Sequence, residues 1–141
     1  MSETRSAPAS FVNLDLELLS EKEPVQLAAE LGRTSFVLFS GPTPDGHLLC
    51  VEPVIGGLLS TDIEACTEHF LKLLGTLTPE SDAQFRACRS RVFDYGFDGG
   101  FESNPIHVDL ASGQLARIAA LDLNVRITTY SYRAAAPENE S

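Results

Sequence analysis

The two ends of this 141-residue chain repeat one order of sequence patterns, in which a strand-like segment is followed by a helix-like segment and a second strand. The segments near the start are Phe11–Leu19, Pro24–Gly32 and Ser35–Ser40. Those near the finish are Ile106–Leu110, Ser112–Asp122 and Leu123–Tyr132. Because elements of this kind bury their apolar faces only against one another, two β-α-β patterns in one small chain predict a single α+β sandwich.

The strand predictions rest on apolar side chains that recur at every second position. In Phe11–Leu19 this places four apolar residues on one face of a sheet: Val12, Leu14, Leu16 and Leu18. In the last segment Leu123, Val125, Ile127 and Thr129 share one face, and Asn124, Arg126, Thr128, Tyr130 and Tyr132 share the other. Phe36–Phe39 is apolar throughout, which is typical of a central strand.

Turn and capping residues set the other boundaries. Thr61 with Glu64 is a capping box, Thr78-Pro79 begins a further helix, and Ser112 is the expected cap of the last one. Leu115, Ile118, Ala119 and Leu121 of that helix are expected to face inward. The turn-rich segment 41–46 predicts a hairpin onto His47–Val54, and 55–59 is expected to be a loop. Val92–Phe97 is predicted as a strand, and Phe101–Leu110 as a returning, partly irregular one.

The resulting order, β-α-β-β-α-α-β-β-α-β, predicts a two-layer α+β sandwich with a mostly antiparallel sheet and helices on one face. The preferred version is a ferredoxin-like arrangement with extra elements. We expect one domain at residues 10–133, with disordered tails at 1–9 and 134–141, which are rich in Ser, Ala and Pro.

Acidic residues outnumber basic ones 20 to 10, which gives a formal charge of −10. Such a surface repels nucleic acids and anionic membranes, and it suits a basic partner protein; the alternative is a solvated surface without a specific role. No apolar run reaches the ~20 residues that span a bilayer, and the first ten residues lack the apolar core of a signal peptide. Three widely separated cysteines, Cys50, Cys66 and Cys88, fit reduced thiols and a cytoplasmic location.

Two arrangements are weighed as catalytic. Cys66 and His69 lie three residues apart on one helix side, although Cys66 also lies on that helix's apolar stripe and fits an ordinary core position. Asp94 and Asp98 are a possible pair of acid–base carboxylates. A metal site would draw on Cys66, His69, His107 and Asp109, but their spacing does not predict that they meet. We therefore expect no catalytic residues, metal or cofactor.

Two further sets of residues are candidates for ligand binding. The segment Asp94–Glu102 combines glycines with aromatic and acidic side chains, so Asp94, Tyr95, Asp98 and Phe101 are candidate ligand contacts in a loop. The alternative is ordinary turn chemistry. The arginines Arg86, Arg89 and Arg91 are candidates for binding an anion, with Arg86 and Arg89 on one helix face. The alternative is helix C-terminal charge paired with nearby acids.

The outer face of the last strand is the candidate interface. Arg126, Tyr130 and Tyr132 belong to residue types enriched at protein interfaces, and Asp15 and Glu17 are expected to face the same side. If no element covers that side of the sheet, it is suited to self-association, such as a homodimer, or to a partner protein.

The closing pattern HVDLASGQLARIAALDLNVRITTYSY, with RVFDYGFDGG before it, resembles the C-terminal part of small uncharacterised bacterial proteins of about this length. The resemblance covers the last third of the chain and rests on core periodicity, so it transfers no catalytic residue. It implies an α+β fold without an assigned activity. Some small acidic proteins of this kind look like toxin-neutralising immunity proteins.

Together these patterns predict a non-enzymatic bacterial protein of the cytoplasm that acts through protein contacts, in an immunity-like or regulatory role. The first alternative is a small-molecule-binding domain with its pocket near Asp94–Phe101. The second is an enzyme that uses Cys66 with His69, or Asp94 with Asp98.

Overall fold

The computed structural model describes residues 10–56, 58–59, 62–98 and 107–130. Its elements in chain order are β1 (Ser10–Ser20), α1 (Val25–Leu31), β2 (Ser35–Thr43), β3 (Gly46–Ile55), β4 (Leu58–Leu59), α2 (Ile63–Gly75), α3 (Pro79–Arg86), β5 (Ser90–Asp98), α4 (Ser112–Ala120) and β6 (Asn124–Tyr130). The main sheet has the strand order β2-β3-β1-β5-β6, and the two-residue β4 pairs with the end of β3. Where a loop is expected at 55–59, the chain therefore forms a short strand pair.

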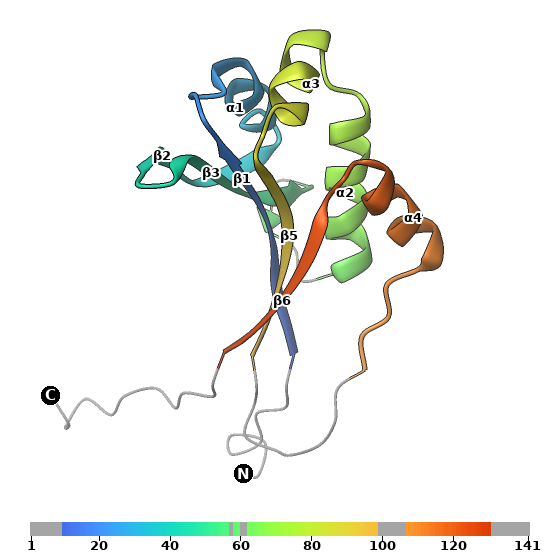
Figure 1. Ribbon diagram of the computed structural model, residues 1–141. Coiled ribbons are helices and arrows are strands. Elements are labelled where there is room, and N and C mark those ends of the chain that lie inside the picture. Colours follow the sequence, from blue (N-terminus) through green and yellow to red (C-terminus); the bar gives the residue numbers. More distant parts are fainter. Residues whose placement is uncertain (1–9, 57, 60–61, 99–106, 131–141) are drawn as a thin grey trace, which may run out of the picture.

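Neighbouring strands of the sheet run antiparallel from β2 to β5, and β6 alone pairs in parallel, with β5 (Figure 1). Since β1 and β2 are both antiparallel to β3, they run in the same direction with β3 between them. The prediction of an α+β protein with a mostly antiparallel sheet is confirmed. The ferredoxin-like arrangement stays a prediction.

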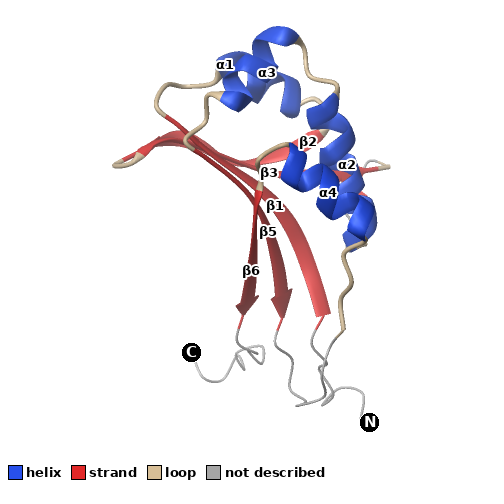
Figure 2. Ribbon diagram, turned by 45° about the vertical axis from the view of Figure 1, so that its right-hand side comes forward, coloured by secondary structure: helices blue, strands red, loops and turns tan. Residues whose placement is uncertain are grey.

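All four helices of the described residues lie on one side of the sheet (Figure 2). The predicted alternation in β1 is confirmed for Leu14, Leu16 and Leu18, which are buried under this helical layer. At Val12 a register shift interrupts it, and Phe11 packs against the core in its place. Phe93 and Tyr95 of β5 are buried beside them, and Phe70 of α2 packs on Phe93 with ring centroids 5.8 Å apart. The apolar core therefore lies between the sheet and the helices.

Two of the predicted helix caps differ from the structure. Helix α2 is capped by Asp62, whose carboxylate accepts hydrogen bonds from the backbone N–H groups of Glu64 and Ala65. Thr61, the expected cap, lies outside the described residues. Ser112 is the first residue of α4 rather than its cap, and Ala111 precedes it without a side-chain hydrogen bond. Thr78 caps α3 as predicted.

The prediction that Phe36–Phe39 forms a central strand is wrong, because β2 lies at the edge of the sheet. A continuous apolar run fits a strand covered on both faces, but here Phe36 and Phe39 are about half exposed. At the opposite edge, Val125 and Ile127 point to the helical side as predicted and yet remain exposed. The sequence pattern predicted which face of the sheet Val125 and Ile127 occupy, but it did not predict how deeply they are buried.

The likeness of the two chain ends is only partly reproduced. A returning strand was expected at residues 101–110, but residues 107–110, the part that is described, form no strand. In α4 the buried side chains are Ile118 and Gln114, whereas Leu115 faces solvent although it was expected inside. Helix α4 is thus a peripheral element that buries a narrow stripe.

We expect Phe93→Ala to destabilise the protein by about 3–5 kcal/mol, because it removes a fully buried ring from the centre of the core. The matched control is Phe39→Ala, which removes the same ring from the exposed edge and should cost less than about 1 kcal/mol. Urea unfolding followed by circular dichroism measures both values. Equal losses would place the apolar core elsewhere.

Candidate functional site

The face of the sheet opposite the helices, here called the open face, carries a band of polar side chains. The strand register places Asp15 beside Asp94, Asp94 beside Arg126, and Glu17 beside Cys50. The other polar members of the band are Asn13, Glu52, Thr128 and Tyr130. Among the described residues no helix covers this face (Figure 2). The predicted positions of Asp15, Glu17, Arg126 and Tyr130 on one side are confirmed.

Arg126 links the edge strand β6 to the two strands beside it. Its Nη1 donates to Glu17 Oε1 at 2.9 Å and to Asp94 Oδ2 at 3.3 Å. The hydroxyl of Thr128 donates to the other oxygen of Asp94 at 2.7 Å. Asp94 is therefore held by two β6 side chains, and its own side chain is only 12% exposed.

A second group of polar side chains lies beside this one, on β1 and β3. The amide nitrogen of Asn13 donates to Glu52 Oε2 at 2.7 Å and to Asp15 Oδ1 at 3.2 Å. Partial burial and the neighbouring Glu52 carboxylate, with smaller effects from Asp94 and Glu17, raise the pKa of Asp15 to about 7. Asp15 thus binds a proton at a pH where an ordinary aspartate is fully ionised.

Gly96 of β5 makes room for this arrangement. A Cβ atom at this position would meet the side-chain oxygen of Asn13 and would lie 3.3 Å from the ring of Tyr130. A larger residue would push aside the amide that bridges Asp15 and Glu52. The sequence suggested a flexible turn at these glycines, whereas Gly96 provides space within a strand.

Four carboxylates and one guanidinium meet on the open face, so its centre is negative: Asp15, Glu17, Glu52 and Asp94 against Arg126. The thiol of Cys50 responds to that charge. Burial, followed by the four carboxylates, raises the pKa of Cys50 to about 12. Cys50 is therefore a neutral thiol and a poor nucleophile at physiological pH.

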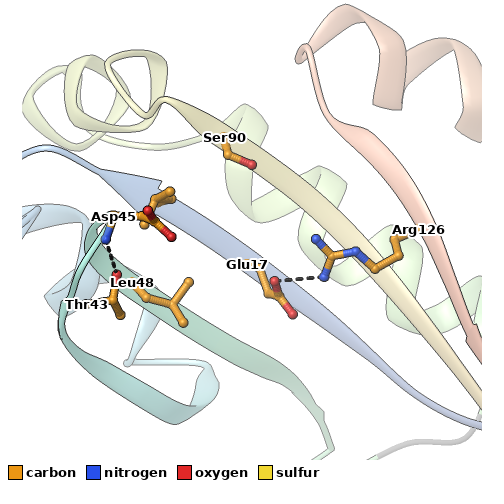
Figure 3. A pocket seen from close by; sticks show the side chains of 7 residues that line it. Glu17, Thr43, Asp45, Leu48, Ser90 and Arg126 are labelled. Atoms are coloured by element: carbon orange, nitrogen blue, oxygen red, sulfur yellow. Dashed lines mark hydrogen bonds and ion pairs between the residues drawn. The ribbon is translucent and has the colours of Figure 1, made fainter. Parts of the chain in front are cut away.

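A shallow hollow of about 270 Å³ adjoins the cluster. Its lining residues are Glu17, Leu19, Thr43, Asp45, Leu48, Ser90 and Arg126. Figure 3 shows Glu17 and Arg126 pointing toward each other, with Thr43 and Asp45 of the β2–β3 turn across the hollow. Its volume lies just below the usual range for small-molecule sites, which starts at about 300 Å³.

The described part of the predicted ligand-binding loop, residues 94–98, is a strand. Asp94, Tyr95 and Asp98 all belong to β5, and Tyr95 is fully buried on the helical side. Its hydroxyl lies 2.7 Å from Thr67 Oγ1, which itself donates to the carbonyl of Ile63. Tyr95 is therefore a core residue, while Asp94 lies on the open face and Asp98 is exposed at the strand end. Phe101 lies outside the described residues.

The three arginines Arg86, Arg89 and Arg91 contact different groups. Arg86 pairs with Asp82 one helical turn earlier, at 2.9 Å. Arg91 donates to carbonyls at the end of α3, including that of Cys88 at 2.8 Å, and its guanidinium carbon lies 5.6 Å from the Phe85 ring centroid. Arg89 lies beyond the end of α3, so it does not share a helix face with Arg86, and it donates to the Asp45 carbonyl. The contacts of Arg86 and Arg91 are those of the helix-terminus alternative, whereas Arg89 contacts the β2–β3 turn.

The proposed nucleophile Cys66 is completely buried in the core. His69 lies on the same helix with Nε2 at 3.4 Å from Ser35 Oγ, and burial lowers its pKa. In the described parts of the chain, no three His, Cys, Asp or Glu side chains are grouped so that they could hold a metal ion. Cys66, His69, His107 and Asp109 are thus not brought together as a metal site. Tyr132, the third interface candidate, lies outside the described residues.

Sequence reasoning missed Asn13 and Glu52, which complete the cluster, and Thr128, which holds Asp94. A signal for Glu52 was present, because the alternation of Leu49 and Val51 in β3 puts residues 50 and 52 on the opposite face. The pairing of β3 with β1 was not readable from the sequence.

No family model matches the chain, and neither a curated protein nor a solved structure shows significant similarity to it. Within the described residues, no helix combines the length and the apolar character required to cross a membrane.

The raised pKa of Asp15 predicts a pH-dependent stability. The folded protein holds a proton between the ordinary aspartate value of 3.8 and about 7, so the stability from this group is present at acid pH and is lost as the pH rises through about 7. We expect Asp15→Asn, which removes the charge, to stabilise the protein at pH 8 by about 1 kcal/mol after allowance for solvent screening.

That gain should already be smaller at pH 5, and it should reach zero only below about 3.8, where Asp15 is protonated in both the folded and the unfolded chain. Thermal unfolding of both proteins across this range measures the difference in melting temperature. A difference that does not change with pH would mean that Asp15 titrates like an ordinary aspartate.

Proposed function

We propose that this chain is a non-enzymatic protein-interaction domain whose open face binds a partner with a basic surface. The observation that carries the proposal is the sheet face that no described helix covers, where four carboxylates meet Arg126. A basic partner would complement this charge and would be attracted over a distance by the net charge of −10.

The chemistry of the open face fits a contact with another protein. Arg126 and Tyr130 are of types enriched at interface centres, and Tyr130 is about half exposed. Asp15 and Glu52 both accept from Asn13. In the described cluster, Arg126 contacts Glu17 and Asp94, and no such arginine contact is made to Asp15 or Glu52. An arginine or lysine of the partner would supply that charge and release the proton of Asp15.

We also infer a ferredoxin-like core. The order β2-β3-β1-β5 with antiparallel neighbours supports it. So do the helical connections, because α1 joins β1 to β2 across β3, and α2 with α3 joins β3 to β5 across β1. Helix α4 and β6 would then be the extra elements.

A small-molecule-binding domain is the second candidate, and the hollow beside Glu17 and Arg126 favours it. A carbonyl or carboxylate group of a ligand could accept from Arg126. Native mass spectrometry of the protein isolated from its host distinguishes the two, since a bound small-molecule mass supports this candidate and a bound protein supports the first.

The charge proposal predicts that removing carboxylates from the open face weakens binding to a basic probe. We expect the double variant Asp15→Asn with Glu52→Gln to bind an oligo-arginine peptide at least about tenfold more weakly at pH 8. The control, Glu21→Gln with Glu23→Gln, removes two carboxylates from an exposed loop and should cost less than about twofold. Isothermal titration calorimetry at physiological salt measures both affinities.

Equal losses in the two variants would mean that the peptide responds only to net charge, and they would contradict a site on the open face. Chemical-shift changes confined to β1, β3 and β5 in the wild type are expected in support.

A further inference from the structure

The edge strand β2 exposes an unusual run of apolar side chains. Phe36, Val37, Leu38 and Phe39 are between 38% and 53% exposed. Phe36 and Phe39 lie on the open face, beside Glu52 and Cys50, and Val37 lies on the helical side beside Val51. Leu38 sits in a register shift without an opposing residue on β3. Apolar side chains therefore flank both faces of this edge.

This edge also lacks charge. Residues 34–44 (TSFVLFSGPTP) contain no Asp, Glu, Lys or Arg, in a chain whose net charge is −10. Proteins usually protect an edge strand from pairing with other chains by charged side chains, prolines or bulges, and β2 has Pro42 near its end and a bulge at Leu38 but no charge. Among the described residues, no strand pairs with the outer side of β2. The other edge strand, β6, carries the charged Arg126.

We propose that β2 is a self-association site, at which it pairs antiparallel with β2 of a second copy of this chain. A two-fold axis places the same segment on both sides of an interface, so each surface has to be complementary to itself. Because the chain is strongly acidic, most of its surfaces would repel the same surface of a second copy. The β2 edge carries no charge and would not repel its copy. Its apolar side chains on both faces and its main-chain groups can pair with those of the second copy.

The geometry has a consequence for the open face. The two-fold axis of an antiparallel strand pair is perpendicular to the sheet, so the two sheets join into one and both open faces point to the same side. The dimer would present two acidic clusters together and bind a partner with two basic patches more tightly than the monomer does. This consequence rests on the proposed function, whereas the dimer itself does not.

The exposed area indicates a weak dimer. Large aromatic side chains bury about 150–250 Å² when fully covered, so four half-exposed apolar side chains supply roughly 300 Å² per subunit. Stable interfaces bury about 800 Å² per subunit. We therefore expect a dissociation constant in the micromolar range or above, so that the fraction of dimer grows as the protein concentration rises.

Sedimentation equilibrium of the full chain across low to high micromolar concentrations tests the proposal. We expect a monomer–dimer equilibrium that Leu38→Lys weakens at least tenfold, because it places two ammonium groups close to the two-fold axis. Leu38 has no opposing residue on β3, so the fold should tolerate the change, which circular dichroism checks. The matched control is Ile127→Lys on the opposite edge, which should leave the equilibrium unchanged.

Hydrogen exchange supplies a readout that does not depend on a variant. Backbone amides of residues 36–40 should become more protected as the wild-type concentration rises. A monomer at every concentration would overturn the proposal, as would a dimer that responds to Ile127→Lys and not to Leu38→Lys. Protection of β2 that does not change with concentration would indicate that another segment of the same chain covers the edge, and it would also overturn the proposal.

Discussion

All the helices in the described residues lie on one side of the sheet, and this one-sided packing governs the rest of the structure. Under the helices the strands direct leucine and aromatic side chains into a closed core, as Leu16 and Phe93 show. On the other side no helix of the described residues covers the sheet, and polar side chains are stable there. The polar cluster of Asp15, Glu17, Asp94 and Arg126 lies on that open face.

The open face is stabilised by charge pairs rather than by apolar packing. Arg126 contacts carboxylates from two strands, Glu17 on β1 and Asp94 on β5, and so attaches the edge strand β6 to the centre of the sheet. Each pair is partly exposed, so each contributes modestly, but they share one guanidinium and form a network. The same network leaves Asp15 beside Glu52, and burial together with this adjacent carboxylate raises the pKa of Asp15.

Local periodicity was sufficient to predict the α+β class, the inward leucines of β1, and the side on which Arg126 and Tyr130 lie. It failed where the outcome depends on pairing between distant segments. Phe36–Phe39 has the composition of a central strand, yet strand order put it at an edge, and no local pattern encodes strand order. Tyr95 was predicted both within a strand and as a ligand contact of the segment Asp94–Glu102, and its complete burial in β5 leaves only the strand prediction. The cluster of Asp15, Glu52 and Asp94 joins three strands, so its members could be recognised singly from the sequence but not as a group.

The most direct test of the account is site-specific photo-crosslinking in the host cell. A benzophenone amino acid is placed at Tyr130 on the open face or at Leu115 on α4, two positions of similar exposure on different elements. The account predicts that position 130 forms an adduct with one protein that has a basic surface, and that position 115 does not. Adducts from position 115 alone, or from neither position, would contradict the claim that the open face of the sheet is the interaction surface.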